Sequence, residues 1–593
     1  MHLALIDWII IALYFAVVLV IGVVVSRKVG DNVSDFFLSD RSMPWWLLGV
    51  SMVATTFSAD TPNLVTGLVR ESGVAGNWSW WAFLLTGMLT VFVYAKLWRR
   101  SMVVTDVEFY ELRYSGRAAA FLRGFRALYL GLIFNVVVMG TTSLAAVKFG
   151  ETVLGMPGWL TLLIAGSITL VYSVFGGLRA VVITDFVQFV LAMIGAVWAC
   201  IYLVNHERVG GLTTLLSSPT VAAKKHLLPD FSDPAQWVPV LLVPLAVQWW
   251  ASYYPGAEPG GGGFIAQRMF SAKTERSAVR ATLLFTTAHY ALRPWPWILI
   301  ALASLLVFPE LADIQRVFPE LSADKLGHDV AYPAMLTLLP TGLLGLVAAS
   351  LIAAFMSTIS TQLNLGASYL VNDFYQRFVN PAASQRQLVW VARLVILLTA
   401  VLGLGIGLLL TDASQAFNLL LLLGAGTGLI YILRWFWWRI NAVTEIVAMG
   451  ASLLIAAYFT FANSGLEGWQ TIVVGSLLTT GVWIVSVYFT PPTDDKTLRH
   501  FYRTIRPGGG GWDTVIRKAR AEGIPLEKKV GQLPLELLCV VVGSFTVIAA
   551  LFATGHWIYG NMGLAAGLTV ATAGGIAFLL RAWRRLQTDE VGQ

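Results

Sequence analysis

The chain has 593 residues, of which 57% are hydrophobic and only 12% are charged. Its mean hydropathy is +0.71, and a soluble domain carries roughly twice this share of charged residues. This composition excludes a soluble multidomain protein. Apolar runs of about 20 residues recur, each long enough to cross a bilayer core of about 30 Å. The sequence therefore predicts an all-α polytopic membrane protein, and it excludes a membrane barrel, whose strands would alternate polar and apolar residues.

The net charge of +7 does not indicate a nucleic-acid partner, because the basic residues cluster in short loops between apolar runs. Length and hydropathy predict about 15 transmembrane helices, with boundaries good to a few residues. These candidate spans cover roughly residues 6–25, 45–68, 78–98, 124–150, 157–175, 180–204, 237–269, 279–308, 335–371, 389–410, 415–437, 441–461, 469–489, 534–554 and 560–580.

Loop charge predicts the orientation of these spans in the bilayer. Basic residues occupy every second loop. These loops include the one that contains Arg27, the one that is expected to contain Arg268, and the strongly basic stretch 490–533. The alternate loops, such as 151–157 and 411–414, carry almost no positive charge. Positive charge marks the cytoplasmic side, so we expect the N-terminus outside and the C-terminus in the cytoplasm.

Two candidate spans are interrupted by residues that do not suit a continuous helix. The span 45–68 is polar in its middle, at 54–62, and the span 237–269 contains four glycines and two prolines at 254–263. These interruptions fall at corresponding positions of two five-helix halves. Paired interruptions of this kind are typical of transporter sites built on discontinuous helices.

A third polar feature is a group of four hydroxyl side chains in the apolar run 351–364. Ser357, Thr358, Ser360 and Thr361 share one face at helical spacing. One interpretation is ordinary Ser/Thr packing between membrane helices, which is worth about 0.6 kcal/mol per bond. The other is a binding site for a small cation such as sodium, because hydroxyls and free backbone carbonyls supply the oxygen ligands that it prefers.

Charged side chains inside apolar runs are costly and are candidates for function. Asp185 lies near the cytoplasmic end of its span and has Arg179 as an alternative, structural partner. Asp60 adjoins the first interruption, where it can bind an ion, a solute or Arg293, or hydrogen-bond to unwound backbone. Arg293 can meet an anionic solute or pair with Asp60 or Glu258.

Aromatic residues gather near the predicted outer mouth. Asn77, Trp78 and Trp81 begin the span 78–98, where indole faces suit a sugar-like or ring-shaped solute. The alternative is an aromatic belt at the membrane surface. We find no arrangement of nucleophile and base and no metal-ligand spacing, so we do not expect an enzyme.

With these features in place, the chain resembles the sodium/solute symporter family, which includes sodium–glucose, sodium–proline and sodium–sialic acid transporters. The resemblance covers roughly residues 5–440. It rests on Phe36-Phe37-Leu38 with Trp45-Trp46, Ser51–Ser58, Gly176–Gln188, Gln267-Arg268, Ala353–Asn364 and Asp373-Phe374-Tyr375.

This resemblance implies a leucine-transporter-type fold, in which ten core helices form two inverted five-helix repeats. The core would occupy residues 45–437, after a leading transmembrane helix within 1–30. Two additional helices would lie in 438–489. A basic cytoplasmic loop at 490–533 would then separate them from two final helices and a short cytoplasmic tail in 534–593.

The resemblance also implies two sodium sites and a solute site. The first sodium site would use Ala54, Phe57, Ala354, Ser357 and Thr358. The second would use Asp185, Ser360 and Thr361. Family members bind solute on the first, second, sixth, seventh and tenth core helices. The candidate solute contacts are Asp60, Thr61, Asn77, Trp78, Trp81, Tyr254, Glu258, Phe264 and Arg293.

These observations predict a sodium-coupled symporter that imports a small polar solute, either sugar-like or a small carboxylate, by alternating access. The alternative is a transporter-like receptor that signals through the loop 490–533. We expect sodium as the coupling ion, the lipid bilayer as the setting, and a bacterial inner membrane as the location.

Overall fold

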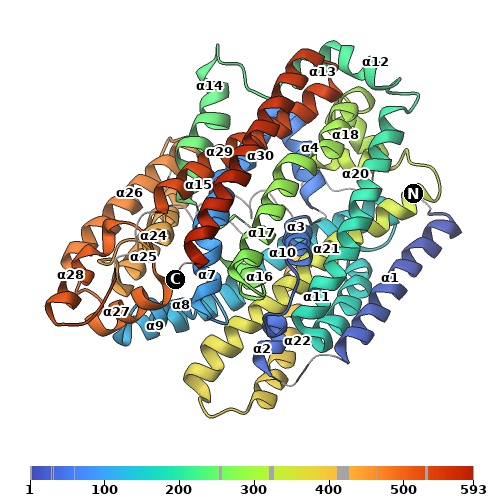
Figure 1. Ribbon diagram of the computed structural model, residues 1–593. Coiled ribbons are helices and arrows are strands. Elements are labelled where there is room, and N and C mark those ends of the chain that lie inside the picture. The colour runs from blue at the N-terminus through green and yellow to red at the C-terminus, as the bar shows by residue number, and fades with distance from the viewer. Residues whose placement is uncertain are drawn as a thin grey trace.

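The computed structural model describes residues 3–27, 30, 32–58, 60–252, 257–319, 326–410, 426–462, 464–527 and 532–591, with side chains up to residue 586. Within these ranges every regular element is helical, and the one isolated β-bridge joins Met43 and Ala272. Figure 1 shows the helices packed side by side in one elongated bundle. This confirms the predicted all-α architecture.

Eleven described helical segments are long and apolar enough to cross a membrane. Each overlaps one or two predicted spans, with ends that differ by up to eight residues. The segments are Leu5–Ser26, Val74–Ser101, Gly116–Leu154, Gly158–Val204, Glu275–Val307, Leu343–Val379, Gln385–Leu409, Ala442–Phe461, Gly468–Phe489, Leu533–Ile558 and Met562–Leu586.

One of these segments, α11 (Gly158–Val204), consists of two helices. Its 47 residues would measure about 70 Å as a continuous helix, more than twice the bilayer core. Gly177 breaks it with φ 51° and ψ −158°. A side chain there would also meet the Phe36 carbonyl, because a Cβ would lie 2.6 Å from that oxygen. The break explains why the sequence shows two spans, 157–175 and 180–204.

The two predicted interruptions separate pairs of shorter helices. In the first, α3 (Trp45–Thr55) ends before α4 (Asp60–Ser72) begins. In the second, α15 (Trp249–Ala251) is followed by α16 (Gly263–Phe270). Before and at the start of α16, Gly260, Gly261 and Gly263 have positive φ, a conformation that glycine adopts without steric cost. The last predicted core span, 415–437, is described only from residue 426 and contains α24 (Gly428–Leu433).

Other spans include π-helical turns, which often occur at functional sites. The segment 74–101 contains η2 (Val74–Asn77), α5 (Trp78–Trp81), α6 (Leu84–Leu89), η3 (Thr90–Tyr94) and α7 (Ala95–Ser101). The next consists of α9 (Gly116–Leu128), η4 (Tyr129–Phe134), α10 (Asn135–Phe149) and η5 (Gly150–Leu154). The segment 275–307 contains α17 (Glu275–Thr287), η8 (Ala288–Leu292) and α18 (Trp295–Val307).

The helix with the four hydroxyls, α21 (Leu343–Ser368), lies at the centre of the bundle. It packs against α11, α10, α22 (Gln385–Leu409) and the leading helix α1 (Leu5–Ser26), and it continues into η11 (Tyr369–Val379). Of its most apolar window, 94% is buried by protein, against 6% for the last helix, α30 (Met562–Val591). The hydroxyl face of α21 must therefore find its partners inside the protein.

A buried carboxylate of the leading helix forms hydrogen bonds to the beginning of α21. Asp7 of α1 is 1% exposed, and its Oδ1 accepts hydrogen bonds from the backbone N–H of Gly342 (2.7 Å) and Gly345 (2.8 Å). A carboxylate is favourable at a helix N-terminus, where N–H groups lack partners. Asp7→Ala should therefore lower the melting temperature of the purified protein, with a loss of about 1–2 kcal/mol of stability. Asp7→Asn, which keeps an acceptor oxygen, should retain part of the stability, and an unchanged melting temperature in Asp7→Ala would contradict this role.

The basic stretch 490–533 is a folded unit that packs on the core. It contains α27 (Asp495–Ile505) and α28 (Asp513–Ala521), which lie beside α8 (Phe109–Arg113) in Figure 1. Trp512 is fully buried, stacks on Phe501 at 5.4 Å, and donates its indole N–H to the Trp435 carbonyl at 2.9 Å. The unit therefore contacts the end of the last core helix.

The remaining described helices lie at the two ends of the bundle or flank it. The end opposite α27 carries α12 (Leu212–Ser217), α13 (Pro219–Lys224), α14 (Pro234–Trp237), α19 (Leu311–Val317) and α20 (Ala331–Leu336). Next to α14 in sequence are η6 (Val238–Leu242) and η7 (Pro244–Gln248). The short α2 (Val33–Leu38) packs on α11, while α25 (Ala442–Phe461) pairs with α26 (Gly468–Phe489) and α29 (Leu533–Ile558) pairs with α30.

Candidate functional site

Asp185 of α11 is the centre of a fully buried polar cluster. Its Oδ2 accepts a hydrogen bond from Ser51 Oγ of α3 at 2.5 Å, and its Oδ1 accepts one from Ser357 Oγ of α21 at 2.6 Å. The guanidinium of Arg268, on α16, lies 3.4 Å from Oδ2. The alternative partner from the sequence, Arg179, donates instead to Ser42 Oγ at 3.2 Å. Asp185 thus links both interrupted spans to α21.

Arg268 is the charged partner that sequence reasoning placed incorrectly, in a cytoplasmic loop. It is 0% exposed and donates to Thr361 Oγ1 at 2.7 Å and to Ser51 Oγ at 3.2 Å. It also donates to Gln267 Oε1 at 3.0 Å, and Gln267 Nε2 donates to Asn364 Oδ1 at 2.8 Å. The signal in the sequence was a polar Gln-Arg pair directly after the glycine-rich interruption.

The four hydroxyls of α21 have distinct partners. Ser357 donates to Asp185, whereas Ser360 donates to the Ser357 carbonyl at 3.0 Å. Thr361 Oγ1 lies 3.1 Å from Thr55 Oγ1. Hydrogen bonds therefore connect Ser357 to Asp185 and Thr361 to the end of α3. The rotation of α21 turns Ser357 toward α11 and Thr361 toward α3.

Thr358 connects α21 to the end of α3, where the first interruption begins. Its Oγ1 is 3.2 Å from the Thr55 carbonyl and 3.3 Å from the Ala354 carbonyl, and it donates to both. The Ala54 carbonyl accepts from the Phe57 N–H at 3.1 Å. The Thr358 hydroxyl thus lies next to two backbone carbonyls, and hydroxyls and carbonyls are the ligand types that suit a small monovalent cation.

A cavity of about 150 Å³ lies directly beside Thr358. It contains four of the predicted solute contacts, Asp60, Thr61, Phe264 and Arg293. Further hydroxyls, an amide and aromatic rings complete the wall: Thr55, Thr56, Ser58, Thr141, Thr142, Gln362, Trp80, Phe83, His289 and Tyr290, among others. Opposite charges, hydroxyls and ring faces in one space suit a small polar organic solute.

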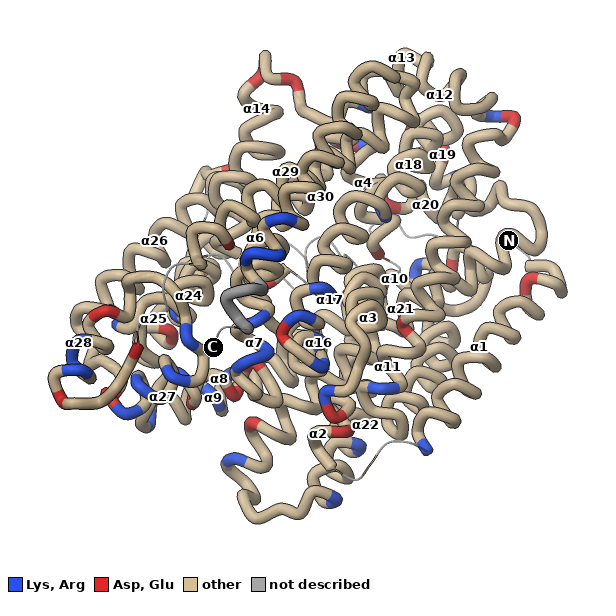
Figure 2. The backbone as a smooth tube through the Cα atoms, in the orientation of Figure 1, with Lys and Arg blue, Asp and Glu red and all other residues tan. Residues whose placement is uncertain are grey.

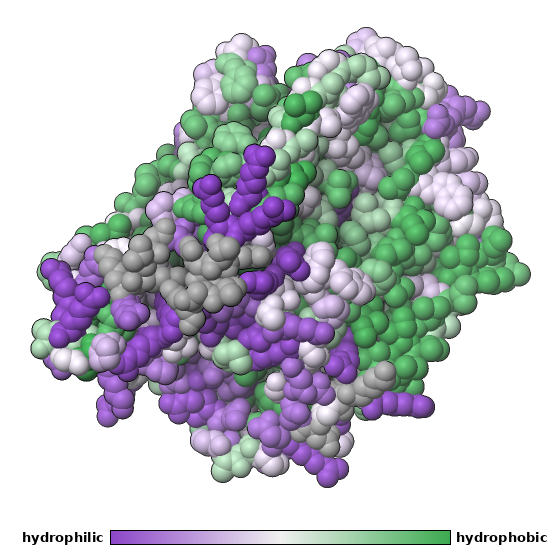
Figure 3. Space-filling model, viewed as in Figure 1, coloured by the Kyte–Doolittle hydropathy of each residue, from purple (hydrophilic) through white to green (hydrophobic). Residues whose placement is uncertain are grey.

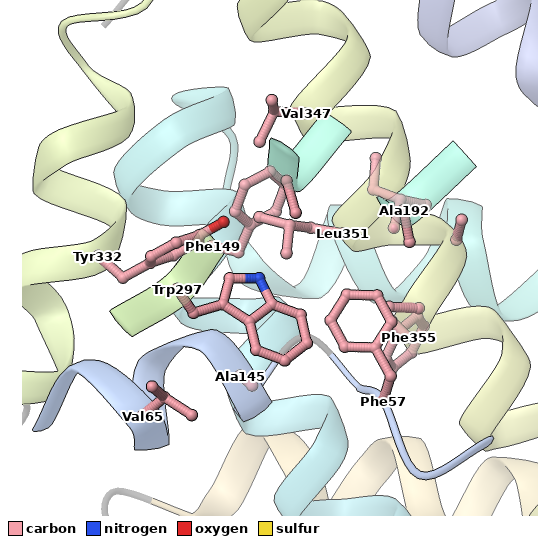
Figure 4. Close-up of a cluster of buried hydrophobic side chains, with 14 of the residues drawn as sticks. Phe57, Val65, Ala145, Phe149, Ala192, Trp297, Tyr332, Val347, Leu351 and Phe355 are labelled. Atoms are coloured by element: carbon pink, nitrogen blue, oxygen red, sulfur yellow. The ribbon is translucent and has the colours of Figure 1, made fainter. Parts of the chain in front are cut away.

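The two charged groups of the cavity are held differently. The Asp60 carboxylate lies at the first residue of α4, where backbone N–H groups lack partners within the helix. The Arg293 guanidinium lies over the rings of Phe57 (5.8 Å) and Trp297 (5.4 Å), and it donates to the Val53 carbonyl at 3.4 Å. Figure 4 shows Phe57 and Trp297 facing each other, and their rings stack at 4.9 Å.

Three predicted solute contacts on η2 and α5 lie outside the cavity wall. The residue of this stretch that lines the cavity is Trp80. Trp78 donates its indole N–H to the Leu227 carbonyl at 3.0 Å, and Trp81 packs edge-on against it at 5.7 Å. Asn77 is 0% exposed and accepts at 2.9 Å from the indole N–H of Trp80. Asn77 therefore orients Trp80, which lines the cavity, whereas Asn77, Trp78 and Trp81 are not themselves part of the cavity wall.

The remaining predicted solute contacts come from the second interruption. Tyr254 lies outside the described residues. Glu258 is buried beside Gly262 and Gly263, next to Asp106, whose Oδ2 accepts from the Gly263 N–H at 2.9 Å. This place at the beginning of α16 is not part of the cavity wall.

His289 is a cavity residue that sequence reasoning missed. It belongs to the π-helical turn η8, one turn before Arg293, and its Nδ1 lies 3.2 Å from Thr56 Oγ1. Its ring also packs edge-on against Trp80 at 5.5 Å. The available signal was the spacing of a histidine and an arginine four residues apart in an apolar run, which places both on one helical face.

Comparison with known proteins adds independent findings. Residues 36–455 match the model of the sodium:solute symporter family. The chain is 27% identical over 478 residues to a sodium/glucose cotransporter of Vibrio parahaemolyticus, covering 77% of this chain and 86% of that protein. It is 27% identical over 435 residues to a sodium/myo-inositol cotransporter of Mus musculus, covering 67% and 58% respectively. The solved structure of a substrate-bound, outward-open Na⁺-coupled sialic acid symporter is similar in fold, with a TM-score of 0.67 and 20% identity, over 83% of this chain and 99% of that one.

Proposed function

The chain belongs to the sodium:solute symporter family, and we propose that the solute it imports with sodium is a small polar organic molecule, sugar-like or a small carboxylate. Sodium is a cotransported ion here rather than a resident cofactor. Each sodium that enters down a membrane potential of 100 mV contributes about 2.3 kcal/mol. The solute is carried by alternating access through the cavity between the interrupted spans.

The position of Thr358 carries this proposal. Its hydroxyl bonds to carbonyls at the end of α3 and within α21, and the same residue lines the solute cavity. An ion bound by this hydroxyl would hold α3 against α21. That would fix one wall of the cavity, so that sodium binding would tighten the solute site. We therefore propose Ala54, Phe57, Ala354, Ser357 and Thr358 as the first sodium site.

We also propose a second sodium site around Asp185, Ser360 and Thr361. In the structure Arg268 already lies beside this carboxylate, so the position of Arg268 affects whether the ion can bind. The guanidinium lies 3.4 Å from the Asp185 carboxylate and donates to Thr361. A sodium ion at Asp185 would bring a second cation to the same carboxylate. We propose that the second ion binds only in a state in which Arg268 has moved away.

The cavity supports a hydroxylated solute, with or without a carboxylate. Asp60 and the threonines accept hydrogen bonds from hydroxyl groups, and Trp80 offers a ring face. Among the described residues of the wall, Arg293 is the one arginine, and its guanidinium suits an anionic group. The relatives named above carry glucose, myo-inositol and sialic acid, which are all polyhydroxylated, and this supports the same class.

A thermal-shift screen of sugars, polyols and small carboxylates, with and without sodium, tests the proposal. A solute bound only by the folded protein raises its melting temperature. We expect at least one polyhydroxylated compound to do so, and more strongly in sodium than in potassium. A hit must then show sodium-dependent uptake into proteoliposomes. Stabilisation that is equal in sodium and potassium, with no uptake, would favour the receptor alternative.

Trp80 provides a test of the solute wall. Trp80→Ala removes a ring face from the cavity, and we expect the KM for the identified solute to rise about fivefold to tenfold, since such contacts are worth about 1 kcal/mol or more. Sodium binding should be retained. Trp159→Ala is the matched control, because Trp159 is 55% exposed on the membrane surface of the bundle. An unchanged KM in Trp80→Ala would remove this residue from the solute site.

For the location we propose a bacterial inner membrane, with the N-terminus outside and the C-terminus in the cytoplasm. Figure 2 supports the orientation, because Lys and Arg gather at the end of the bundle formed by α2, α7, α8 and α27, and fewer lie at the end formed by α12 and α14. Figure 3 shows the same end as hydrophilic, beside a broad hydrophobic surface on α1 and its neighbours. Cytoplasmic positive charge is the usual arrangement.

A further inference from the structure

Three membrane-spanning segments meet at a recess on the basic end of the bundle, outside the transport site. The segments 74–101, 275–307 and 562–586 each begin or end there. The recess has a volume of about 40 Å³ and is lined by Phe92, Lys96, Glu275, Arg276, Val279, Trp583 and Leu586. It therefore lies where hydrocarbon gives way to headgroups.

The recess has more positive than negative charge that is not neutralised by an ion pair. Lys96 forms an ion pair with Glu536, and Glu275 forms one with Arg100, with the closest atoms of the latter pair 2.6 Å apart. The exposed side chains of Arg276 and Arg280 form no ion pair or hydrogen bond with another described residue. They are four residues apart on α17 and so share one face. The recess therefore has one uncompensated positive charge in its lining, Arg276, and a second, Arg280, one helical turn further along α17.

The floor of the recess is apolar. Phe92 is 4% exposed, and Val279, Trp583 and Leu586 are half-buried around it. A tryptophan at this depth is typical of the membrane interface. The exposed Arg581 of α30 lies two residues from Trp583 and adds positive charge near the recess. In Figure 2 the basic positions of α7, α17 and α30 lie close together.

We propose that this recess binds the headgroup of an anionic phospholipid, with the phosphate at Arg276 and Arg280 and an acyl chain along Phe92 and Trp583. Guanidinium groups suit phosphate oxygens, which they bind in bidentate geometry. The apolar floor next to the charges suits a lipid rather than a soluble anion. This site is independent of the sodium and solute sites, so its failure would leave the proposed transport function untouched.

Replacing both arginines tests the site. For the purified full-length protein, phosphatidylglycerol should raise the melting temperature more than phosphatidylcholine does at the same total lipid. In Arg276→Gln/Arg280→Gln this difference should disappear, with lipid binding about 30-fold weaker by titration, because each cation contributes about 1 kcal/mol. The matched control is Arg117→Gln/Arg386→Gln, which removes two exposed arginines elsewhere. It should keep the difference.

Two further experiments distinguish a lipid from a soluble phosphate and provide a variant in which both arginines are kept. Soluble glycerol phosphate should not stabilise the wild type, and stabilisation equal to that by the lipid would overturn a lipid site. Trp583→Ala keeps both arginines and should weaken phosphatidylglycerol binding through loss of the apolar floor. Full retention of the phosphatidylglycerol effect in the double arginine variant, or its equal loss in the control variant, would also overturn the proposal.

Discussion

Replacing Thr358 with valine should weaken sodium binding by at least about tenfold, equivalent to 1.4 kcal/mol or more, and should abolish sodium-dependent uptake. Valine has nearly the volume of threonine, so the change removes the hydroxyl without leaving a cavity. The carbonyls of Thr55 and Ala354 then lose their common donor, at 3.2 and 3.3 Å. The proposed ion site loses one oxygen ligand. The measurement is sodium binding to the purified protein, followed by solute uptake in proteoliposomes.

The matched control is Thr399→Val in α22. Thr399 is 1% exposed, and its hydroxyl donates within its own helix to the Val395 carbonyl at 2.8 Å. Removing it costs one ordinary hydrogen bond, about 1 kcal/mol or less, and should leave sodium binding unchanged. Equal effects of the two substitutions would mean that Thr358 acts through packing alone.

Breaking the Asp185–Arg268 pair should have the largest effect on stability. Both side chains are 0% exposed, so Asp185→Asn or Arg268→Gln leaves one buried charge without its counter-charge. Such losses are about 3–5 kcal/mol. The double variant should be more stable than either single one, because it removes both charges. Melting temperatures of the four proteins give the coupling energy of this pair.

A less buried pair provides the comparison for this cycle. Lys148 and Asp329 lie 3.5 Å apart, and the carboxylate side chain is 34% exposed. Lys148→Gln should therefore cost about 1 kcal/mol or less. If the effects of the Asp185 and Arg268 substitutions on stability are additive, the two charges do not compensate each other. The proposal that Arg268 must move away before a second sodium ion binds would then be wrong.

The sequence was informative wherever a local pattern determines structure. Hydropathy located the spans, and the polar run 54–62 and the glycines at 260–263 located both interruptions. Gly177 separates two helices where the sequence indicated two spans. In each case the cause is within a few residues, in helix length, proline or glycine. The family resemblance, confirmed by the match over residues 36–455, supplied the fold that joins these parts.

The contacts that sequence reasoning did not identify depend on helix rotation and chain direction. Arg268 follows Gly263 by little more than one helical turn, and sequence reasoning grouped it with the basic loop residues that come after it in the chain. Trp80, not Trp78 or Trp81, faces the cavity because of the turn from η2 into α5. Ser357 contacts Asp185 because of the rotation of α21 against α11. None of these rotations can be calculated from spacing along one helix.

The most direct test of sodium coupling through Thr358 is the binding of radioactive sodium to the purified protein, which requires no knowledge of the solute. Wild type and Thr399→Val should bind sodium saturably, with displacement by unlabelled sodium and not by potassium. Thr358→Val should show binding weakened by at least about tenfold. Sodium binding that is the same in Thr358→Val and wild type would contradict the account.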